Sequence, residues 1–340
     1  MAKRGYVTGN PEIDSEIDRL AKKYSTPRTR EYIQQLFMTV VKLHLDKADE
    51  RDLYLVNVTL KELRHIFRTF NKYRDVRKVV IFGSHRSLPK SKEYKITENF
   101  ARKIVERDWM VITGGGGGVM EAGNLGAGKK GFAVKIKLPQ EFKPNPYVSR
   151  GEKLINVKYF FTRKLAFLKE SDATVLFPGG FGTHDEGFEV LTLLQTGKAT
   201  PRPIVFVESP GKTYWKTWFR FLKKELLRGK YLIGPDFKLF SVVNSAEAAV
   251  KEVTDFYRVY HSIRYGKEIT IVRLNEKVSD RKLERLSGKY QDMIDGGIRP
   301  SGPLPSEVRG KELLDKPRIC MKFDRKSFGR LMEFIRDLNG

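Results

Sequence analysis

Residues 178–186, Pro-Gly-Gly-Phe-Gly-Thr-His-Asp-Glu, bring together the residue types that phosphate binding and carboxylate chemistry need. Glycine leaves no side chain in the way of a ligand and lets the backbone turn tightly. Three glycines occur here, namely Gly179, Gly180 and Gly182. Thr183 carries a hydroxyl that can donate to a phosphate oxygen, and Glu186 adds a carboxylate nearby. These residues could hold a phosphate group and place a carboxylate beside it.

The flanking sequence places this segment at a turn from a strand to a helix. Residues 173–177 form an apolar run of the length of a buried strand. After the turn, apolar residues recur at helical spacing, at Phe188, Val190, Leu191, Leu193 and Leu194. The first N–H groups of a helix are unpaired and lie at the positive end of its dipole, so the turn is an expected anion site.

A purely structural interpretation of the same residues stays open. Thr183 followed by Glu186 fits a capping box, in which the two side chains satisfy backbone N–H groups at a helix start. The preceding glycines favour a ligand site, because glycines after a buried strand weaken folding unless a tight turn or a ligand requires them.

Other strand ends carry residues suited to ligand contact. Residues 78–82 predict a strand that leads to Gly83 and Ser84, and residues 109–112 predict another, followed by five glycines over residues 114–118. The glycine run lacks the Lys-Ser/Thr ending of a P-loop and does not fit the spaced dinucleotide fingerprint. Flexible turns also collect glycine, but the position between a strand and a helix favours a phosphate or ribose contact.

Two cations open a predicted helix. Arg163 and Lys164 lie in its first turn, where the helix dipole opposes positive charge. Cations placed against the dipole suggest that an anion binds nearby, and a solvated basic pair is the alternative.

The elements that must position these residues alternate between strand and helix. Glycine turns at the strand ends predict an α/β fold, a doubly wound, Rossmann-like parallel sheet of about six strands or more, over residues 76–260. Ligands bind such sheets at the carboxyl ends of the strands, where the chain order reverses. Residues 1–75 predict an N-terminal helical extension and residues 261–340 a small C-terminal α+β appendage, with residues 296–305 as an irregular link.

Composition limits the classes of protein and of site. The single cysteine, Cys320, excludes an internal disulfide framework and a Cys-based metal cluster. No apolar run approaches ~18 residues and the first residues contain no apolar signal region, so we expect a cytoplasmic protein without membrane contact. The net charge of +24 could attract nucleotides. It also makes nucleic-acid binding possible, although no nucleic-acid-binding motif accompanies it.

The motif Pro178-Gly-Gly-Phe-Gly-Thr-x-x-Glu186, preceded by Arg163 and Lys164, resembles the paired signature of the LOG ("Lonely Guy") family of phosphoribohydrolases, which are often mislabelled as lysine decarboxylases. Phe82-Gly83-Ser84, the glycine run and Met120 resemble that family as well. The resemblance covers about residues 76–258. Shorter members have Met-His-x before the Arg-Lys pair, whereas this chain has Phe160-Phe161-Thr162.

The resemblance implies hydrolysis of the N-glycosidic bond of a nucleoside 5′-monophosphate to free base and ribose 5-phosphate. Glu186 would act on the ribose and on the positive charge of an oxocarbenium-like transition state, and Arg163 would orient the substrate or the departing base. The residues that would contact the nucleotide and its phosphate are Gly83, Ser84, Gly115, Gly116, Lys164, Gly179, Gly180, Gly182 and Thr183. No metal and no cofactor is implied.

The resemblance also implies a homodimer or a larger homo-oligomer, with the pocket near the subunit interface. An AMP-like purine nucleotide is the default substrate, pyrimidine nucleotides stay open, and specificity for cytokinin ribosides is not implied. Two other functions remain: a nucleotide sensor without turnover, and a nucleic-acid-binding accessory protein. Lysine decarboxylation has little support, because no pyridoxal-phosphate signature is present.

Overall fold

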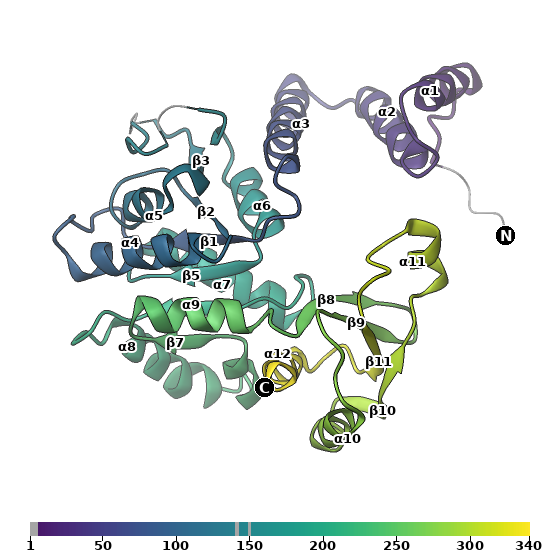
Figure 1. The fold of residues 1–340 in the computed structure, drawn as a ribbon. Coiled ribbons are helices and arrows are strands. Elements are labelled where there is room, and N and C mark those ends of the chain that lie inside the picture. The colour runs from purple at the N-terminus through teal and green to yellow at the C-terminus, as the bar shows by residue number, and fades with distance from the viewer. Residues whose placement is uncertain (1–5, 140–142, 149–150) are drawn as a thin grey trace. The chain divides into compact units, whose positions relative to one another are not determined.

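The computed structural model describes residues 6–139, 143–148 and 151–340 (Figure 1). The chain divides into two compact units, Met1–Arg64 and His65–Gly340. The first unit contains α1 (Pro11–Lys23), α2 (Arg30–Leu45) and the beginning of α3 (Glu50–Asn71). The side chain of Asn10 caps α1 by accepting from backbone N–H groups of its first turn, and α1 packs against α2. The N-terminal extension is therefore helical, as predicted.

A seven-stranded parallel sheet forms the core of the second unit. Its strands lie in the order β4-β3-β2-β1-β5-β6-β7, and each neighbouring pair is parallel. The strands are β1 (Lys78–Phe82), β2 (Met110–Thr113), β3 (Gly131–Ile136), β4 (Leu154–Val157), β5 (Ala173–Leu176), β6 (Ile204–Val207) and β7 (Ser241–Val243). This confirms the predicted α/β fold with a Rossmann-like parallel sheet.

Helices cover both faces of this sheet because its strands are apolar on both sides. Side chains alternate along β5: Ala173 and Val175 join the core under α4 and α9, while Leu176 joins the core under α7. The helices are α4 (Lys92–Val105), α5 (Val119–Ala127), α6 (Phe160–Glu170), α7 (Phe181–Gln195), α8 (Tyr214–Phe221) and α9 (Ala246–Asp255), with the 3₁₀ segments η1 (Gly128–Lys130) and η3 (Gly234–Lys238) and the π-helical η2 (Leu222–Leu227).

The chain order reverses between β1 and β5, which are neighbours in the sheet. Strands β1 to β4 extend to one side of this point and β5 to β7 to the other. The loops that follow β1 and β5 therefore leave the same edge of the sheet side by side, at the place where open α/β sheets bind ligands.

A second, antiparallel sheet follows in the order β10-β11-β9-β8, as predicted for a C-terminal α+β region. Its core is continuous with that of the parallel sheet, since one cluster of buried side chains includes both Phe206 and Val272. The elements are β8 (Tyr260–Tyr265), β9 (Thr270–Leu274), α10 (Asp280–Lys289), β10 (Ile294–Ser301), α11 (Pro305–Gly310), β11 (Arg318–Phe323) and α12 (Phe328–Asn339).

The prediction of an irregular link at residues 296–305 was wrong, because most of this segment belongs to β10 and α11. Gly296 and Gly297 have φ angles of 72° and 76° and sit in a bulge where the register with β11 shifts. Pro300 is tolerated because β10 is an edge strand. The glycines and prolines thus mark a bulged edge strand.

No helix within the described ranges is long and apolar enough to cross a bilayer.

A buried carboxylate joins three segments of the C-terminal region. Glu307, in α11, is fully buried and accepts hydrogen bonds from Arg273 at 2.8 Å and from Arg318 at 3.3 Å. The backbone N–H of Leu304 donates to the same carboxylate at 2.7 Å. These donors hold the pKa of Glu307 below its usual range despite the opposing effect of burial.

We expect Glu307→Gln to lower the free energy of unfolding by about 3–5 kcal/mol, because the substitution removes the carboxylate that pairs with the buried Arg318 and leaves the buried Arg273 with the more distant Glu312, at 3.5 Å. Asp295→Asn is the control, since Asp295 pairs with Lys322 at 3.3 Å and both side chains are exposed on the surface of the same region. That change should cost less than about 1 kcal/mol. Urea denaturation followed by tryptophan fluorescence measures the unfolding free energy of both variants. Equal losses of stability would contradict the structural role of the buried Glu307 carboxylate.

Candidate active site

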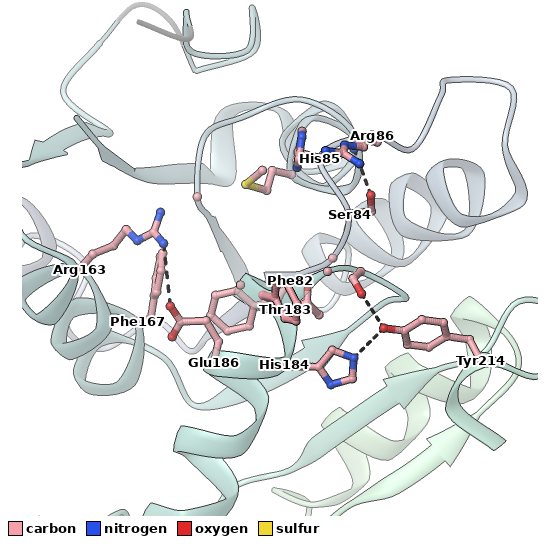
Figure 2. Close-up of a pocket in the computed structure, with 17 residues that line it drawn as sticks. Phe82, Ser84, His85, Arg86, Arg163, Phe167, Thr183, His184, Glu186 and Tyr214 are labelled. Atoms are coloured by element: carbon pink, nitrogen blue, oxygen red, sulfur yellow. Dashed lines mark hydrogen bonds and ion pairs between the residues drawn. The ribbon is translucent and has the colours of Figure 1, made fainter. Parts of the chain in front are cut away.

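A cavity of about 740 Å³ opens at the carboxyl edge of the parallel sheet, where the chain order reverses (Figure 2). Its walls come from the loops after β1, β2 and β5 and from α5, α6, α7 and α8. The lining residues are Phe82, Gly83, Ser84, His85, Arg86, Gly114, Met120, Arg163, Phe167, Gly179, Gly180, Phe181, Gly182, Thr183, His184, Glu186 and Tyr214.

Most of the residues predicted from sequence line this cavity, namely Gly83, Ser84, Arg163, Gly179, Gly180, Gly182, Thr183 and Glu186. Gly115 and Gly116 do not line it; their carbonyl groups accept hydrogen bonds from Asn145 at 3.0 and 3.1 Å. They therefore shape the glycine loop, and Gly114 is the member of the run that reaches the cavity.

Backbone hydrogen bonds hold the loops of the cavity together. The N–H of Ser84 donates to the carbonyl of Pro178 at 3.0 Å, and the N–H of Val119 donates to the carbonyl of Ser84 at 2.9 Å. Gly118 has a φ of 63°, and a side chain there would collide with the Ser84 carbonyl. A side chain at Gly179 would collide with the hydroxyl of Thr183. Close approach of three loops thus explains both glycines.

Helix α7 begins earlier than a capping box at Thr183 would require. Its N-cap residue is Gly180, and Thr183 lies inside the first turn. The proposed capping box is therefore wrong: Thr183 does not cap the helix, and Glu186 lies in the next turn. The N–H groups of Thr183 and His184 both donate to the Gly180 carbonyl, at 3.0 and 3.2 Å. The N–H groups of Phe181 and Gly182 precede them at the positive end of the helix dipole.

Glu186 extends from α7 toward Arg163 of α6 (Figure 2). The nearest approach is 4.0 Å, between Nη2 of Arg163 and Oε1 of Glu186, which is an ion pair but too long for a hydrogen bond. Among the described residues, Oε1 of Glu186 and Nε of Arg163 have no hydrogen-bond partner although both are buried. Two charged groups that need partners thus meet at the cavity wall.

The electrostatics of the pair follow from burial. Glu186 is 6% exposed, and burial raises its pKa to about 7, against the lowering effects of Lys164 and Arg163. Burial likewise lowers the pKa of the Arg163 guanidinium, against the raising effect of Glu186. The carboxylate can therefore take up or release a proton near neutral pH, which suits acid–base or charge-stabilising chemistry.

Lys164, the residue next to Arg163, does not line the cavity. Its ammonium group contacts Glu189 at 2.6 Å, Asp185 at 2.8 Å and Glu186 at 3.8 Å. One cation thus lies among three carboxylates of α7, which leaves Glu186 incompletely neutralised. The predicted contact of Lys164 with a phosphate stays a prediction, since the structure directs this cation to carboxylates.

Two hydrogen bonds made by Tyr214 of α8 hold the glycine turn that precedes α7. The Tyr214 hydroxyl donates to the carbonyl of Gly179 at 2.5 Å and lies 2.6 Å from Nε2 of His184 (Figure 2). A phenolic hydroxyl has one proton, so Nε2 of His184 must donate to it. His184, at a variable position of the sequence motif, therefore contacts Tyr214 and supports the turn.

Sequence reasoning did not assign roles to several lining residues. His85 and Arg86 directly follow Gly83 and Ser84, so the strand end at β1 was a signal that could have identified them. Phe167 lies one helical turn after Arg163. Tyr214 comes from α8, far along the chain, and no local motif marks it.

Comparison with known proteins identifies relatives of this chain. A family model described as "Possible lysine decarboxylase" matches residues 109–253. A cytokinin riboside 5′-monophosphate phosphoribohydrolase of Arabidopsis thaliana is 28% identical over 156 residues, which cover 45% of this chain and 71% of the relative. An uncharacterized protein of Archaeoglobus fulgidus is 32% identical over 117 residues, 34% of this chain and 74% of the relative. The chain belongs to the LOG family.

The LOG-family match covers the segment that carries Arg163, the glycine turn and Glu186. A second Arabidopsis thaliana phosphoribohydrolase of the same description is 29% identical over 159 residues. A crystal structure from a structural genomics consortium shares 27% identity and superposes with a TM-score of 0.38, covering 52% of this chain and 96% of its own. Nowhere in the described ranges do three His, Cys, Asp or Glu side chains gather as a metal site would require.

We expect Glu186→Gln to stabilise the fold increasingly as the pH rises. Burial raises the pKa of Glu186 to about 7 from an ordinary value of 4.5, so the folded state binds a proton that the unfolded state releases between these values. The carboxyl group therefore costs stability progressively from about pH 4.5 to pH 7.

Because Gln cannot ionise, the difference in unfolding free energy between the variant and the natural protein should grow by about 2 kcal/mol from pH 5 to pH 8. Denaturant unfolding at both pH values measures it. Glu189→Gln is the matched control on the same helix, and a difference that does not change with pH for Glu186→Gln would contradict the raised pKa.

Proposed function

We propose that this protein hydrolyses the N-glycosidic bond of a nucleoside 5′-monophosphate, releasing free base and ribose 5-phosphate. The observation that carries the proposal is the buried Oε1 of Glu186, which has no hydrogen-bond partner among the described residues and lies in the wall of a cavity beside the N-terminus of α7. Membership of the LOG family supports it, as does the phosphoribohydrolase activity that the names of the Arabidopsis thaliana relatives state.

The 5′-phosphate would bind at the start of α7. The N–H groups of Phe181 and Gly182 and the Thr183 hydroxyl are the donors on this side, and the helix dipole favours an anion there. Ser84 and Arg86 line the same cavity from the loop after β1. A guanidinium and a hydroxyl opposite the helix would complete a site for a dianion.

Glu186 would act on the sugar. Departure of the base leaves positive charge on C1′ and the ring oxygen, and an ionised carboxylate nearby stabilises that charge. The reaction breaks the bond between C1′ and the base nitrogen; water supplies the hydroxyl at C1′ and a proton to the base. Arg163, whose guanidinium approaches the carboxylate at 4.0 Å, would hold Glu186 in place and contact the departing base or the ribose.

The cavity wall favours a nucleobase over a smaller group. Phe82 and Phe167 lie in it, with their rings packed edge to face at 5.1 Å between centroids. Aromatic rings provide apolar contact for a planar base. An AMP-like purine is our default substrate, with pyrimidine and cytokinin riboside monophosphates as the alternatives.

We further propose a homo-oligomer that buries the rim of the cavity. Phe181 is 97% exposed at this rim, and three other apolar side chains of α6 are about half-exposed, namely Phe160, Phe161 and Leu165. Exposed apolar groups gathered beside a site are typical of an interface.

The division of the chain into a helical extension (residues 1–75), a nucleotide-binding domain (residues 76–260) and a C-terminal appendage (residues 261–340) stays a prediction.

The direct test is to incubate the protein with a panel of nucleoside monophosphates and to follow free base and ribose 5-phosphate by chromatography. Glu186→Gln should lower kcat by about 10²–10³-fold, because it removes the charge that stabilises the transition state. Glu189→Gln should retain activity, since Glu189 pairs with Lys164 outside the cavity. Saturable AMP binding without release of base would favour the sensor, and full activity of Glu186→Gln would sink the proposal.

Tyr214→Phe should raise KM for the nucleotide by about tenfold while changing kcat little, because it removes one hydrogen bond that orients the Gly179 carbonyl. The glycine turn binds phosphate in both the ground state and the transition state, so the loss is expected in binding. Tyr231→Phe is the matched control, as Tyr231 is 80% exposed and outside the cavity. An unchanged KM, or a loss confined to kcat, would contradict this role.

A further inference from the structure

One helical segment that the proposed reaction does not use carries a dense share of the positive charge. Residues 212–230 contain a single acid, Glu225, among seven exposed cations, which we call the basic stripe: Lys212, Lys216, Arg220, Lys223, Lys224, Arg228 and Lys230. The sequence alone suggested a positive charge spread along the chain, because these cations are interspersed with other residues and form no long continuous run.

The helix gathers these cations on its outer face. Lys216, Arg220 and Lys224 are four residues apart, which puts them on one side of α8 and the helical turn that continues it. On the other side, Trp215 and Leu222 are buried in the main core. Burial of Trp215 and Leu222 fixes the rotation of the helix about its axis, so the cations on its opposite side face the solvent.

The π-helical turn extends the stripe. Segment η2 covers Leu222–Leu227, directly after α8. A π-turn takes more residues per turn than an α-helix, so each of its residues turns the chain through a smaller angle about the helix axis. In a continuous α-helix Arg228 would fall about a third of a turn away from Lys216. The wider turn brings Arg228 back toward the line of Lys216, Arg220 and Lys224.

These charges are largely uncompensated. Across the described residues, the one ion pair of the stripe joins Lys224 to Glu225 at 3.3 Å on the exposed surface. Lys223 lies over the ring of Phe219 at 4.6 Å. Exposed aromatic side chains accompany the cations: Phe221 is 51% exposed and Tyr231 is 80% exposed. A row of exposed cations, most of them without a carboxylate partner among the described residues, together with exposed aromatic rings suits a polyanion whose flat groups can stack on those rings.

We propose that the basic stripe binds single-stranded nucleic acid. Successive cations would neutralise successive phosphates, and Phe221 and Tyr231 would stack on bases. A membrane surface fits less well, because an interfacial helix inserts its apolar face and the apolar face of α8 is packed in the core. The cations of the stripe do not line the cavity, so this surface is separate from the proposed nucleotide site.

The test uses the full-length protein and fluorescently labelled strands of RNA and of DNA about 20 nucleotides long, a duplex of the same length, and phosphatidylserine vesicles. The triple variant Lys216→Glu, Arg220→Glu, Lys224→Glu should weaken single-strand binding at least about tenfold and reduce the slope of log K against log salt by about 2. Comparison of the RNA and DNA strands identifies which of the two the surface prefers.

A matched triple variant controls for net charge. Lys277, just before α10, and Arg281 and Arg285, within α10, are exposed, and changing all three to Glu alters the net charge by the same amount. This control should bind nearly as tightly as the natural protein, and Phe221→Ala should weaken single-strand binding about fivefold through lost stacking. Release of base from nucleotides should be unchanged in all three variants.

Equal losses in the two triple variants would overturn the proposal, because they would show a general charge effect. Tighter binding to duplex or to vesicles than to single strands would also overturn it, as would the absence of binding at low salt. Thermal unfolding of each variant separates lost binding from lost folding. A stripe triple that fails to fold is replaced by Lys216→Gln, Arg220→Gln, Lys224→Gln, which must still weaken binding more than the matched Gln control.

Discussion

Burial of one incompletely neutralised carboxylate, that of Glu186, is the constraint on which the candidate site depends. The fold keeps this group 6% exposed, places the Arg163 guanidinium just beyond hydrogen-bond distance, and shares the nearby Lys164 with two other carboxylates. Water would solvate the charge far better, so the arrangement costs stability. Such a cost is expected at a site that stabilises a developing positive charge.

The sheet topology explains how residues far apart in sequence meet at this carboxylate. The reversal of chain order between β1 and β5 puts their loops side by side, and hydrogen bonds between Ser84, Pro178 and Val119 lock them together. Arg163 comes from α6, the helix that precedes β5, and Tyr214 from α8, the helix that follows β6. The site therefore depends on the parallel sheet and on α6, α7 and α8, which pack on one side of it.

Sequence reasoning succeeded where local pattern and fold agree. Apolar runs followed by glycine identified β1, β2 and β5 and, through them, the edge of the sheet at which the cavity opens. It failed at β10, since a bulge uses the same glycines and prolines as a loop, and at the start of α7, since Gly180 rather than Thr183 caps the helix. The sequence did not reveal the role of Tyr214, because Tyr214 is 35 residues from Gly179 in the chain and the two meet only in the folded sheet.

The most direct test of the role of Glu186 is a crystal structure of the Glu186→Gln variant soaked with AMP. We predict the 5′-phosphate on the N–H groups of Phe181 and Gly182, with the base beside Phe167 and C1′ of the ribose facing the amide that replaces the Glu186 carboxylate. In this arrangement the natural carboxylate would lie against the charge that forms as the base departs. A phosphate bound elsewhere, or a ribose turned away from that amide, would contradict the proposed chemistry.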